Sequence, residues 1–343
     1  MERRAGIKDV AALAGVSPAT VSRALNENLS DLVAPETRAR VLAAVASLKY
    51  SANPLAVAMQ KGRSLVVAMV VDGLSDPYPV GRMIDGAQRA FWNRDILLAV
   101  TSAAVGSDRM QRVFDRLYQR RVDGAIYATT SRSRIDIDID VGLPLVLLNT
   151  EGVSMAAPCV IPDEAGGVDT AVTELLHAGH KRVGFVAAEG TDPAGEKFSG
   201  YRHALGRLGL EQDPQLVVAD DAPTTRGGGR SVGRLLHLAS RPTAVLCDNK
   251  AMAVGAYQAA AESGLHVPRD LSVVAFDNDD PAGAEALSPP LTTVALPHFE
   301  MGSRAAHLML DLIEGRPTPP GEPEGRVLVP CHLNRRRSVT EPP

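Results

Sequence analysis

The chain has 343 residues, and 36 Lys and Arg against 40 Asp and Glu give it a formal net charge of −4 at pH 7. This length predicts two to three domains. The sequence has no run of about 18 apolar residues that would span a membrane, and its first residues lack the continuous apolar segment of a signal peptide. We therefore expect a cytoplasmic protein. Its cysteines form no Cys-x-x-Cys pair, which argues against a disulfide framework and a structural zinc site; they are Cys159, Cys247 and Cys331.

The charge is distributed unevenly along the chain. Residues 1–64 contain nine Lys and Arg against five Asp and Glu, a balance of +4, so residues 65–343 carry −8. A basic N-terminal part on an acidic body is typical of a protein that meets a polyanion at one end. A solvated surface with uneven charge is the alternative at this point.

Residues 7–25 predict two short helices. Apolar residues recur at helical spacing before Gly15, and Ser17 can cap a second helix that begins at Pro18. Two helices joined by a three-residue turn with glycine form a helix-turn-helix. A third helix is expected over residues 35–48. Its inward face would carry Val41, Leu42, Val45 and Leu48.

The second helix leaves short and polar side chains off its apolar face. These are Pro18, Ala19, Thr20, Ser22 and Arg23. The first residues of a recognition helix meet bases, and an arginine contacts a guanine edge bidentately. The pattern predicts a DNA-reading helix, although a small three-helix core without a nucleic-acid role stays open on the pattern alone.

From residue 64 onward, short apolar runs alternate with segments of helical period. The runs are LVVAMVV, ILLAV, GAIYA, LVLLN, VGFVAA, LVVAD, AVLCD and SVVAF. This alternation predicts parallel sheets covered by helices on both faces, and ligands of such folds bind at the carboxyl ends of the strands. We expect an all-α N-terminal domain followed by an α/β body of two parallel-sheet subdomains that face each other across a cleft.

Enzymatic motifs are not supported. The string RGGGRSVG at 226–233 lies several residues past a strand and lacks the GxGxxG spacing, so we predict a loop leading into a helix. His177 and His180 have no third ligand at metal-binding spacing and are predicted to be surface residues. There is no GxSxG sequence. We therefore expect no enzyme, no cofactor and no metal.

Two strings carry a specific resemblance. The first string matches the pattern DVAxxAGVSxxTVSRxLN almost completely; it is IKDVAALAGVSPATVSRALN (7–26). The second string follows it and is ETRARVLAAVASLKYSANPLAVAM (36–59). Together they resemble the head and hinge of the lactose/galactose-repressor (LacI/GalR) family of bacterial transcription regulators, and the likeness continues more loosely along the chain. It implies a homodimeric repressor that binds a pseudo-palindromic DNA operator under the control of a sugar-like effector. A solute receptor or a sugar-processing α/β enzyme with a similar body is the alternative.

The resemblance also implies a domain plan. Residues 1–50 would bind DNA, 51–63 would form a hinge helix, and 64–343 would bind the effector and dimerise, with a body similar to periplasmic sugar-binding proteins. Its two subdomains would be joined by three crossings of the chain. The first would comprise residues 64–162 and 295–324, and the second 163–294 and 325–338.

For DNA, the resemblance assigns two groups of residues in the first domain and one in the hinge. Those expected to read bases are Ser17, Pro18, Ala19 and Arg23, and those expected near phosphates are Thr20, Ser22 and Asn26. In the hinge, Leu55 would contact its twin across the dimer axis and Met59 would wedge a base step open. Ala34 stands where the family commonly has a Ser or Asp cap, so the third helix should begin more weakly.

For the effector, the resemblance assigns residues at the ends of strands and at the cleft rim. They are Asp72, Tyr78, Asn149, Lys197, Asn249, Asp277 and His298. Lys197 stands where relatives have an effector-binding arginine. A lysine lacks the planar guanidinium group with which an arginine makes two parallel hydrogen bonds. With Lys250 nearby, this suggests the hypothesis of a partly anionic effector. Polar residues at strand ends often cap the next helix instead, and that alternative stays open.

Overall fold

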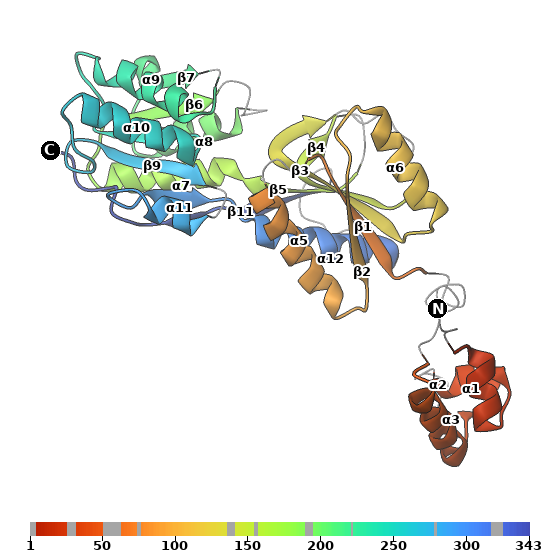
Figure 1. Ribbon diagram of the computed structural model, residues 1–343. Coiled ribbons are helices and arrows are strands. Elements are labelled where there is room, and N and C mark those ends of the chain that lie inside the picture. The colour runs from red at the N-terminus through yellow and green to blue at the C-terminus, as the bar shows by residue number, and fades with distance from the viewer. Residues whose placement is uncertain are drawn as a thin grey trace. The chain divides into compact units, whose positions relative to one another are not determined.

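The computed structural model divides the chain into two units, which we call the head (Met1–Leu65) and the body (Val66–Pro343) (Figure 1). Each is described by itself. None of the helices in the described part is long and apolar enough to cross a membrane. The structure describes residues 5–25, 32–50, 63–73, 77–135, 141–153, 157–188, 195–220, 222–277, 280–316 and 325–343.

The head contains the predicted helix-turn-helix. Its helices are α1 (Ile7–Ala14), α2 (Pro18–Leu25) and α3 (Pro35–Ser47). Gly15 ends α1 with φ 66°, a left-handed conformation that glycine adopts without a Cβ clash. The three helices enclose one small core, whose buried residues are Val10, Ala11, Ala14, Val21, Ala24, Val33, Val41 and Ala44.

Helix α3 differs from the expectation in its inward face. Val41 and Ala44 are its buried residues, Val45 and Leu48 are half-buried, and Leu42 is 45% exposed. The prediction that Leu42 faces the core was wrong. Val41 and Ala44 lie on the side of α3 that contacts the core, and Leu42, one position after Val41, points away from that side. Ala34 gives α3 no side-chain cap, as its residue type predicts.

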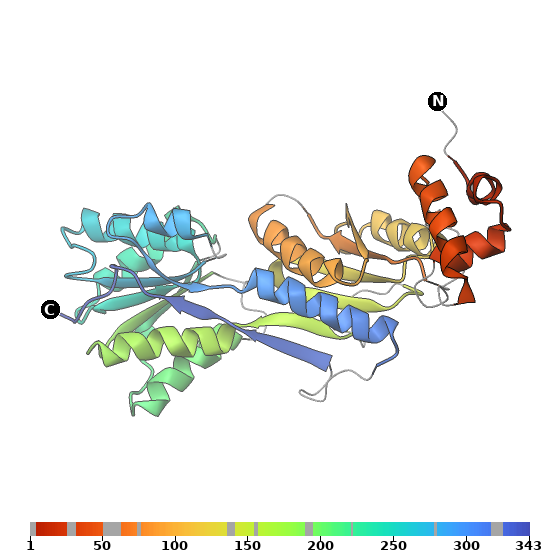
Figure 2. The same cartoon turned by 90° about the horizontal axis from the view of Figure 1, so that it is seen from below.

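The first sheet of the body is parallel, in the order β2-β1-β3-β4-β5-β11. Its strands are β1 (Val66–Val71), β2 (Leu97–Ser102), β3 (Gly124–Ile135), β4 (Leu145–Gly152), β5 (Cys159–Asp163) and β11 (Arg326–Pro330). Helix α6 (Asp108–Gln119) buries Met110 and Phe114 on one face. Helices α5 (Pro77–Trp92) and α12 (His298–Ile313) pack together on the other face (Figures 1 and 2).

The second sheet has the order β7-β6-β8-β9-β10-β12 and is parallel except for β12. Its strands are β6 (Val183–Ala188), β7 (Val217–Asp220), β8 (Ala244–Cys247), β9 (Ser272–Asp277), β10 (Thr292–Ala295) and β12 (His332–Asn334). One face is covered by α7 (Glu164–His177) and α8 (Glu196–Arg207). The other is covered by α9 (Thr225–Leu236) and α10 (Lys250–Glu262), with the short α11 (Pro281–Glu285) beside them. The expected fold class is confirmed.

The chain crosses between the sheets three times (Figure 2). It leaves the first sheet between β5 and α7, returns between β10 and α12, and leaves again between β11 and β12. The last boundary, expected between residues 324 and 325, falls at Cys331 instead. The reason is that β11 pairs in parallel with β5, from Arg326 opposite Cys159 to Pro330 opposite Asp163.

The glycine string at 226–233 lies inside α9 and not in a loop. Thr224 caps the helix by accepting a hydrogen bond from the Gly227 amide (3.2 Å). A Cβ at Gly228 would lie 2.3 Å from the Met252 carbonyl oxygen, and one at Gly255 would lie 2.1 Å from the Thr225 carbonyl oxygen. The glycines therefore allow α9 and α10 to approach closely.

His180 is buried, so the prediction of a surface residue was wrong for it, while His177 is exposed. The ring of His180 lies 2.8 Å from the Thr243 hydroxyl and 2.9 Å from the Thr340 carbonyl oxygen. Burial lowers the pKa of His180. The side chain fastens the C-terminal segment to the second sheet, a long-range role without a local sequence signal.

The close contact of α9 and α10 predicts opposite outcomes for two glycine substitutions. Gly255→Ala should lower the free energy of unfolding by about 1–3 kcal/mol, because a methyl group must displace the backbone of α9. Gly233→Ala, in α9 with no atom within 4 Å of its added Cβ, should raise it by up to about 1 kcal/mol through helix propensity. Urea unfolding of the full chain measures both. Equal effects of the two variants would contradict the assignment.

Candidate functional site

A cavity of about 720 Å³ lies at the carboxyl ends of the strands, between the two sheets. This is where a doubly wound sheet places its ligands. The lining comes from both subdomains. It comprises Tyr78, Thr130, Ser131, Arg132, Asn149, Glu164, Lys197, Pro223, Asp248, Asn249, Lys250, Ala251, Phe276, Asp280, Leu296 and His298.

Lys197 is the central charge of this cavity. The residue is only 6% exposed, and its Nζ lies 2.6 Å from Asp248 Oδ1 and 3.2 Å from Glu164 Oε1. The ammonium also lies 4.8 Å from the centre of the Phe276 ring, a cation–π distance. Burial lowers the pKa of Lys197, but the two carboxylates outweigh it and raise the pKa overall. Lys197 is therefore a fixed positive charge.

Glu164 offers an unused acceptor. It is the first residue of α7, 2% exposed, and one carboxylate oxygen faces Lys197. The other, Oε2, is buried and accepts no hydrogen bond from the described residues. Burial raises the pKa of Glu164 although Lys197 lowers it. A buried acceptor without a partner is costly, so a donor group of a ligand would stabilise it.

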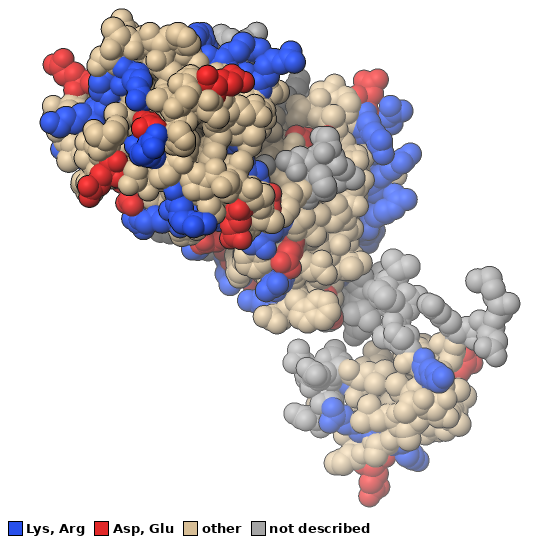
Figure 3. Space-filling view, turned by 60° about the vertical axis from the view of Figure 1, so that its left-hand side comes forward, with Lys and Arg blue, Asp and Glu red and all other residues tan. Residues whose placement is uncertain are grey.

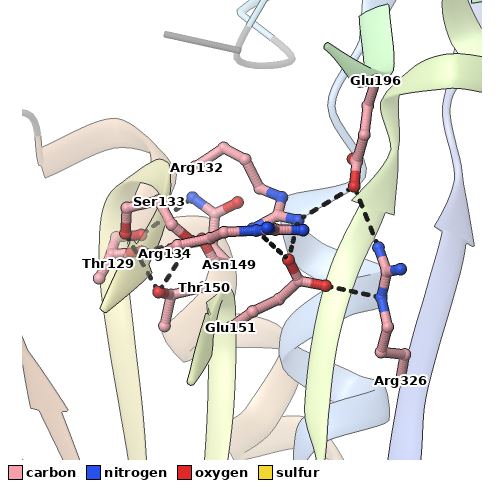
Figure 4. Close-up of polar contacts among 9 residues, drawn as sticks. All are labelled: Thr129, Arg132, Ser133, Arg134, Asn149, Thr150, Glu151, Glu196 and Arg326. Carbon is pink, nitrogen blue, oxygen red and sulfur yellow. Dashed lines mark hydrogen bonds and ion pairs between the residues drawn. The ribbon is translucent and has the colours of Figure 1, made fainter. Parts of the chain in front are cut away.

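Four residues beside the cavity form what we call the inter-subdomain clasp: Arg132, Glu151, Glu196 and Arg326 (Figure 4). Arg132 Nη2 lies 2.9 Å from Glu151 Oε2 and 3.7 Å from Glu196 Oε1. Arg326 Nε lies 2.6 Å from Glu151 Oε1, and its Nη2 lies 3.1 Å from Glu196 Oε1. Glu196 belongs to α8 and the other three to the first sheet, so the clasp joins the subdomains.

The arginines of the clasp favour the charged form of Glu151. Burial raises the pKa of Glu151, but the hydrogen bond from Arg132 and the charges of Arg132, Arg326 and Arg134 outweigh it and lower the pKa overall. Arg134 adds a contact of 3.2 Å from Nε to Glu151 Oε2. Arg132 is shared between clasp and cavity, because it lines the cavity and keeps a buried Nε without a hydrogen-bond partner among the described residues.

Two predicted effector residues line the cavity and also hold backbone. Asn149 has φ 60°, and its Nδ2 donates to the Thr129 carbonyl oxygen (3.0 Å). Asn249 caps α10, with Oδ1 accepting from the Met252 amide (2.8 Å) and Nδ2 donating to the Pro223 carbonyl oxygen (3.3 Å). Asn249 therefore caps the next helix, as the alternative interpretation of polar residues at strand ends predicts, and it also lines the cavity.

The remaining predicted residues separate into three cases. Tyr78, 39% exposed, and the fully buried His298 join Lys197 in the lining. Asp72 does not line the cavity, because its Oδ1 accepts a hydrogen bond from the Thr130 amide (3.0 Å). It contacts the backbone of β3 instead. The side chain of Asp277 lies outside the described residues, although its backbone ends β9.

In the head, α2 presents the predicted DNA-reading side chains. Ser17, Pro18, Ala19 and Arg23 are exposed, and Thr20 and Ser22 are half-buried. The Ser17 hydroxyl accepts a hydrogen bond from the Thr20 amide (3.1 Å) and lies 2.9 Å from the Thr20 hydroxyl, so it caps α2. The predictions for Asn26, Leu55, Met59 and residues 51–62 of the hinge fall outside the described residues.

Comparisons with known proteins agree with this geometry. A family described as "Bacterial regulatory proteins, lacI family" matches residues 6–53, and a "Periplasmic binding protein-like domain" matches residues 172–339. The HTH-type transcriptional repressor CytR of Escherichia coli strain K12 is 33% identical over 342 residues, which is 98% of this chain and 97% of the relative. The chain belongs to the LacI family.

This LacI-family regulator is also similar to relatives and structures that span 90% or more of its length. The ribose operon repressor of Escherichia coli strain K12 is 31% identical over 90% of this chain and 93% of its own. A structure of a "transcriptional regulator CelR-cellobiose complex" is 30% identical, covers 98% of this chain and 100% of its own, and has a TM-score of 0.65. A structure of the Lac repressor dimer bound to operator and ONPF is 24% identical, covers 98% of this chain and 100% of its own, and has a TM-score of 0.75. This likeness supports the fold.

The family gives the biochemical class. The LacI-family regulator is a helix-turn-helix transcription regulator and not an enzyme. As a family member it binds DNA through its helix-turn-helix head, and its body is periplasmic-binding-protein-like.

Several lining residues of the LacI-family regulator were missed by the sequence prediction. Arg132 belongs to the polar string TTSRSR that ends β3, and this string after an apolar strand was the available signal. Glu164 and Asp248 each begin or precede a helix next to a strand end. Their pairing with Lys197 brings together positions more than 30 residues apart, and no local pattern marks such a contact.

The charge of the cavity argues against the anionic effector hypothesis. Lys250 Nζ lies 2.6 Å from Asp280 Oδ2, Lys197 lies between two carboxylates, and Arg132 faces Glu151. Each Lys or Arg in the described lining therefore has a carboxylate partner. An anionic ligand would have to displace one of these carboxylates.

Removing Lys197 should destabilise the body strongly. Lys197→Met leaves Glu164 and Asp248 buried without a countercharge, so we expect a loss of about 3–5 kcal/mol at neutral pH. The loss should shrink as the pH falls, because burial raises the pKa of Glu164 and a proton on this carboxyl removes one of the two uncompensated charges. Urea unfolding of the full chain measures it. Lys250→Met, whose partly exposed pair is worth less than about 1 kcal/mol, is the control, and similar losses for both variants would refute the assignment.

The lowered pKa of Glu151 predicts a pH-dependent contribution of the clasp. A carboxyl whose pKa is lower in the folded state stabilises that state above its unfolded value of about 4.3, and this stabilisation is lost as the pH falls through the folded pKa. Glu151→Gln should therefore lower the melting temperature near pH 7, and its difference from the unsubstituted chain should narrow below about pH 4. Glu300→Gln, in an exposed i,i+4 pair, should show little difference at any pH. A constant Glu151→Gln difference would contradict the prediction.

Proposed function

We propose that this LacI-family regulator represses transcription from a pseudo-palindromic operator and that a neutral, polyhydroxylated effector bound in the cavity controls it. The charge balance of the cavity carries the proposal. Arg132, Lys197 and Lys250 are each paired with carboxylates. The lining therefore offers alternating donors and acceptors without a net positive charge.

The size and the unused polar atoms of the cavity support the same class of ligand. Its volume of about 720 Å³ suits a small molecule. Glu164 Oε2 lacks a donor and Arg132 Nε lacks an acceptor among the described residues. A hydroxyl group both donates and accepts, so a sugar-like molecule would satisfy both atoms. Phe276 and Leu296 supply apolar surface beside them.

The relatives support the proposal by their names. The ribose operon repressor and the CelR–cellobiose complex are named with neutral sugars, and CytR is named a repressor. Because the regulator acts on DNA, we place it in the cytoplasm.

We propose that the clasp connects effector binding to the subdomains. Arg132 lines the cavity and also faces Glu151 and Glu196 across the subdomain boundary. An effector that binds the Arg132 guanidinium would weaken its contacts with Glu151 and Glu196 and so change how the two subdomains are held together. A ligand shifts the equilibrium between two subdomain arrangements when it binds one of them more tightly.

A ligand panel tests the effector class. Calorimetric titration of the full chain with neutral pentoses, hexoses, disaccharides and nucleosides, and with sugar phosphates and uronic acids, should find binding in the neutral set. Glu164→Gln should weaken that binding about tenfold, since it alters one charged hydrogen bond. Glu262→Gln, an exposed residue at the end of α10, is the control. Binding confined to the anionic set would refute the proposal.

A further inference from the structure

Helix α6 carries a second concentration of charge, on residues that do not line the cavity. Four exposed arginines recur at spacings of three or four residues, which places them on one helix face. They line a hollow of about 540 Å³ together with Thr101, Val113 and Leu117. Figure 3 shows Lys and Arg side chains gathered in a column along the edge of the body where α6 lies. We call Arg109, Arg112, Arg116 and Arg120 the arginine row.

The arginine row has no acidic partners within the described part of the chain. Its polar contacts are to backbone, from Arg112 Nε to the Asp108 carbonyl oxygen (3.1 Å) and from Arg120 Nη1 to the Arg116 carbonyl oxygen (3.3 Å). In the same subdomain, Arg94 and Arg316 both pair with Glu314. Like charges at this spacing destabilise a helix, and an external anion bound to the row would relieve their repulsion.

The pairing of β1 with β2 and β3 shows at which end of the first sheet the arginine row lies. Val66 pairs with Leu97 and Val67 with Gly124, so all three strands begin at the same end of the sheet. The Asp123 amide donates to the Val66 carbonyl oxygen (2.8 Å). Because Gly124 follows α6 by only a few residues, the C-terminal end of the row lies at the end of the sheet where the chain arrives from the DNA-binding head.

We propose that the arginine row binds phosphates of the DNA backbone beside the site that the head reads. The proposal rests on the DNA-binding role of the family. Helical spacings of three and four residues set the guanidinium groups about 4.5–6 Å apart along the axis, and arginine binds phosphate bidentately. A head bound to DNA holds the duplex at high effective concentration near the linker, which favours DNA over a separate acidic protein as the occupant.

Salt-dependent DNA binding tests the row. Binding of the full chain to a mixed-sequence duplex of about 40 base pairs is measured by fluorescence anisotropy over a range of salt concentrations. Arg112→Gln/Arg116→Gln should reduce the slope of log K against log[salt] by about 1.8, since each phosphate contact contributes about 0.9. If the affinity extrapolated to 1 M salt is unchanged, affinity near 0.1 M salt should fall about 60-fold.

A charge-matched control separates the row from net charge. Arg202 and Arg226 are exposed arginines on α8 and α9 of the other subdomain, and Arg202→Gln/Arg226→Gln should leave the slope close to that of the unsubstituted chain. Equal slopes for the two double variants would overturn the proposal, and this is also the outcome expected if an acidic protein occupies the row. A lower sedimentation mass of the row variant alone would also overturn it, because the row would then be an interface between copies.

A third variant separates failure of this proposal from failure of DNA binding. Arg23→Gln, on the exposed face of α2, should weaken binding through the head. If Arg23→Gln weakens binding and the row variant does not, the arginine row is refuted while the DNA-binding role stands. If the unsubstituted chain binds no duplex, both are refuted.

Discussion

The buried ammonium group of Lys197 constrains the rest of the cavity. A charge removed from water needs close countercharges, and Glu164 and Asp248 supply them from two different elements. Glu164 begins α7 directly after the chain crosses from the first sheet, and Asp248 follows β8. The ion pairs therefore fix the crossing, α8 and the second sheet relative to one another. They also leave one Glu164 oxygen without a donor among the described residues, and they balance the positive charge of Lys197.

The clasp extends this constraint across the subdomain boundary. Arg132 both lines the cavity and faces Glu151 and Glu196, and Arg326 on β11 faces the same two carboxylates. Effector site and subdomain contact thus share one guanidinium. The position of the last crossing decides this contact. Because β11 belongs to the first sheet, Arg326 contacts Glu196 across the subdomain boundary.

Much of the architecture could be predicted from local patterns. The alternation of apolar runs and helical segments predicted two parallel sheets, and Gly15 with Ser17 predicted the turn of the head. The resemblance to the family, and not a local pattern, assigned seven effector residues, and five of them line the cavity. Asp72 could not be placed, because a carboxylate at a strand end has the same local sequence whether it faces a ligand or the Thr130 amide. The burial of His180 depends on Thr340, 160 residues away.

The sequence by itself determined the family, the helix-turn-helix of the head and the two parallel sheets of the body, because these depend on short motifs and on hydrophobic period. Only the tertiary structure decided the electrostatics. Lys197 in place of an arginine, with Lys250 nearby, suggested an anionic effector, yet both lysines are paired with carboxylates. The arginine row, in contrast, has no acidic partner among the described residues. Coulombic interaction depends on distance and burial. Those arise only when segments distant in sequence come together.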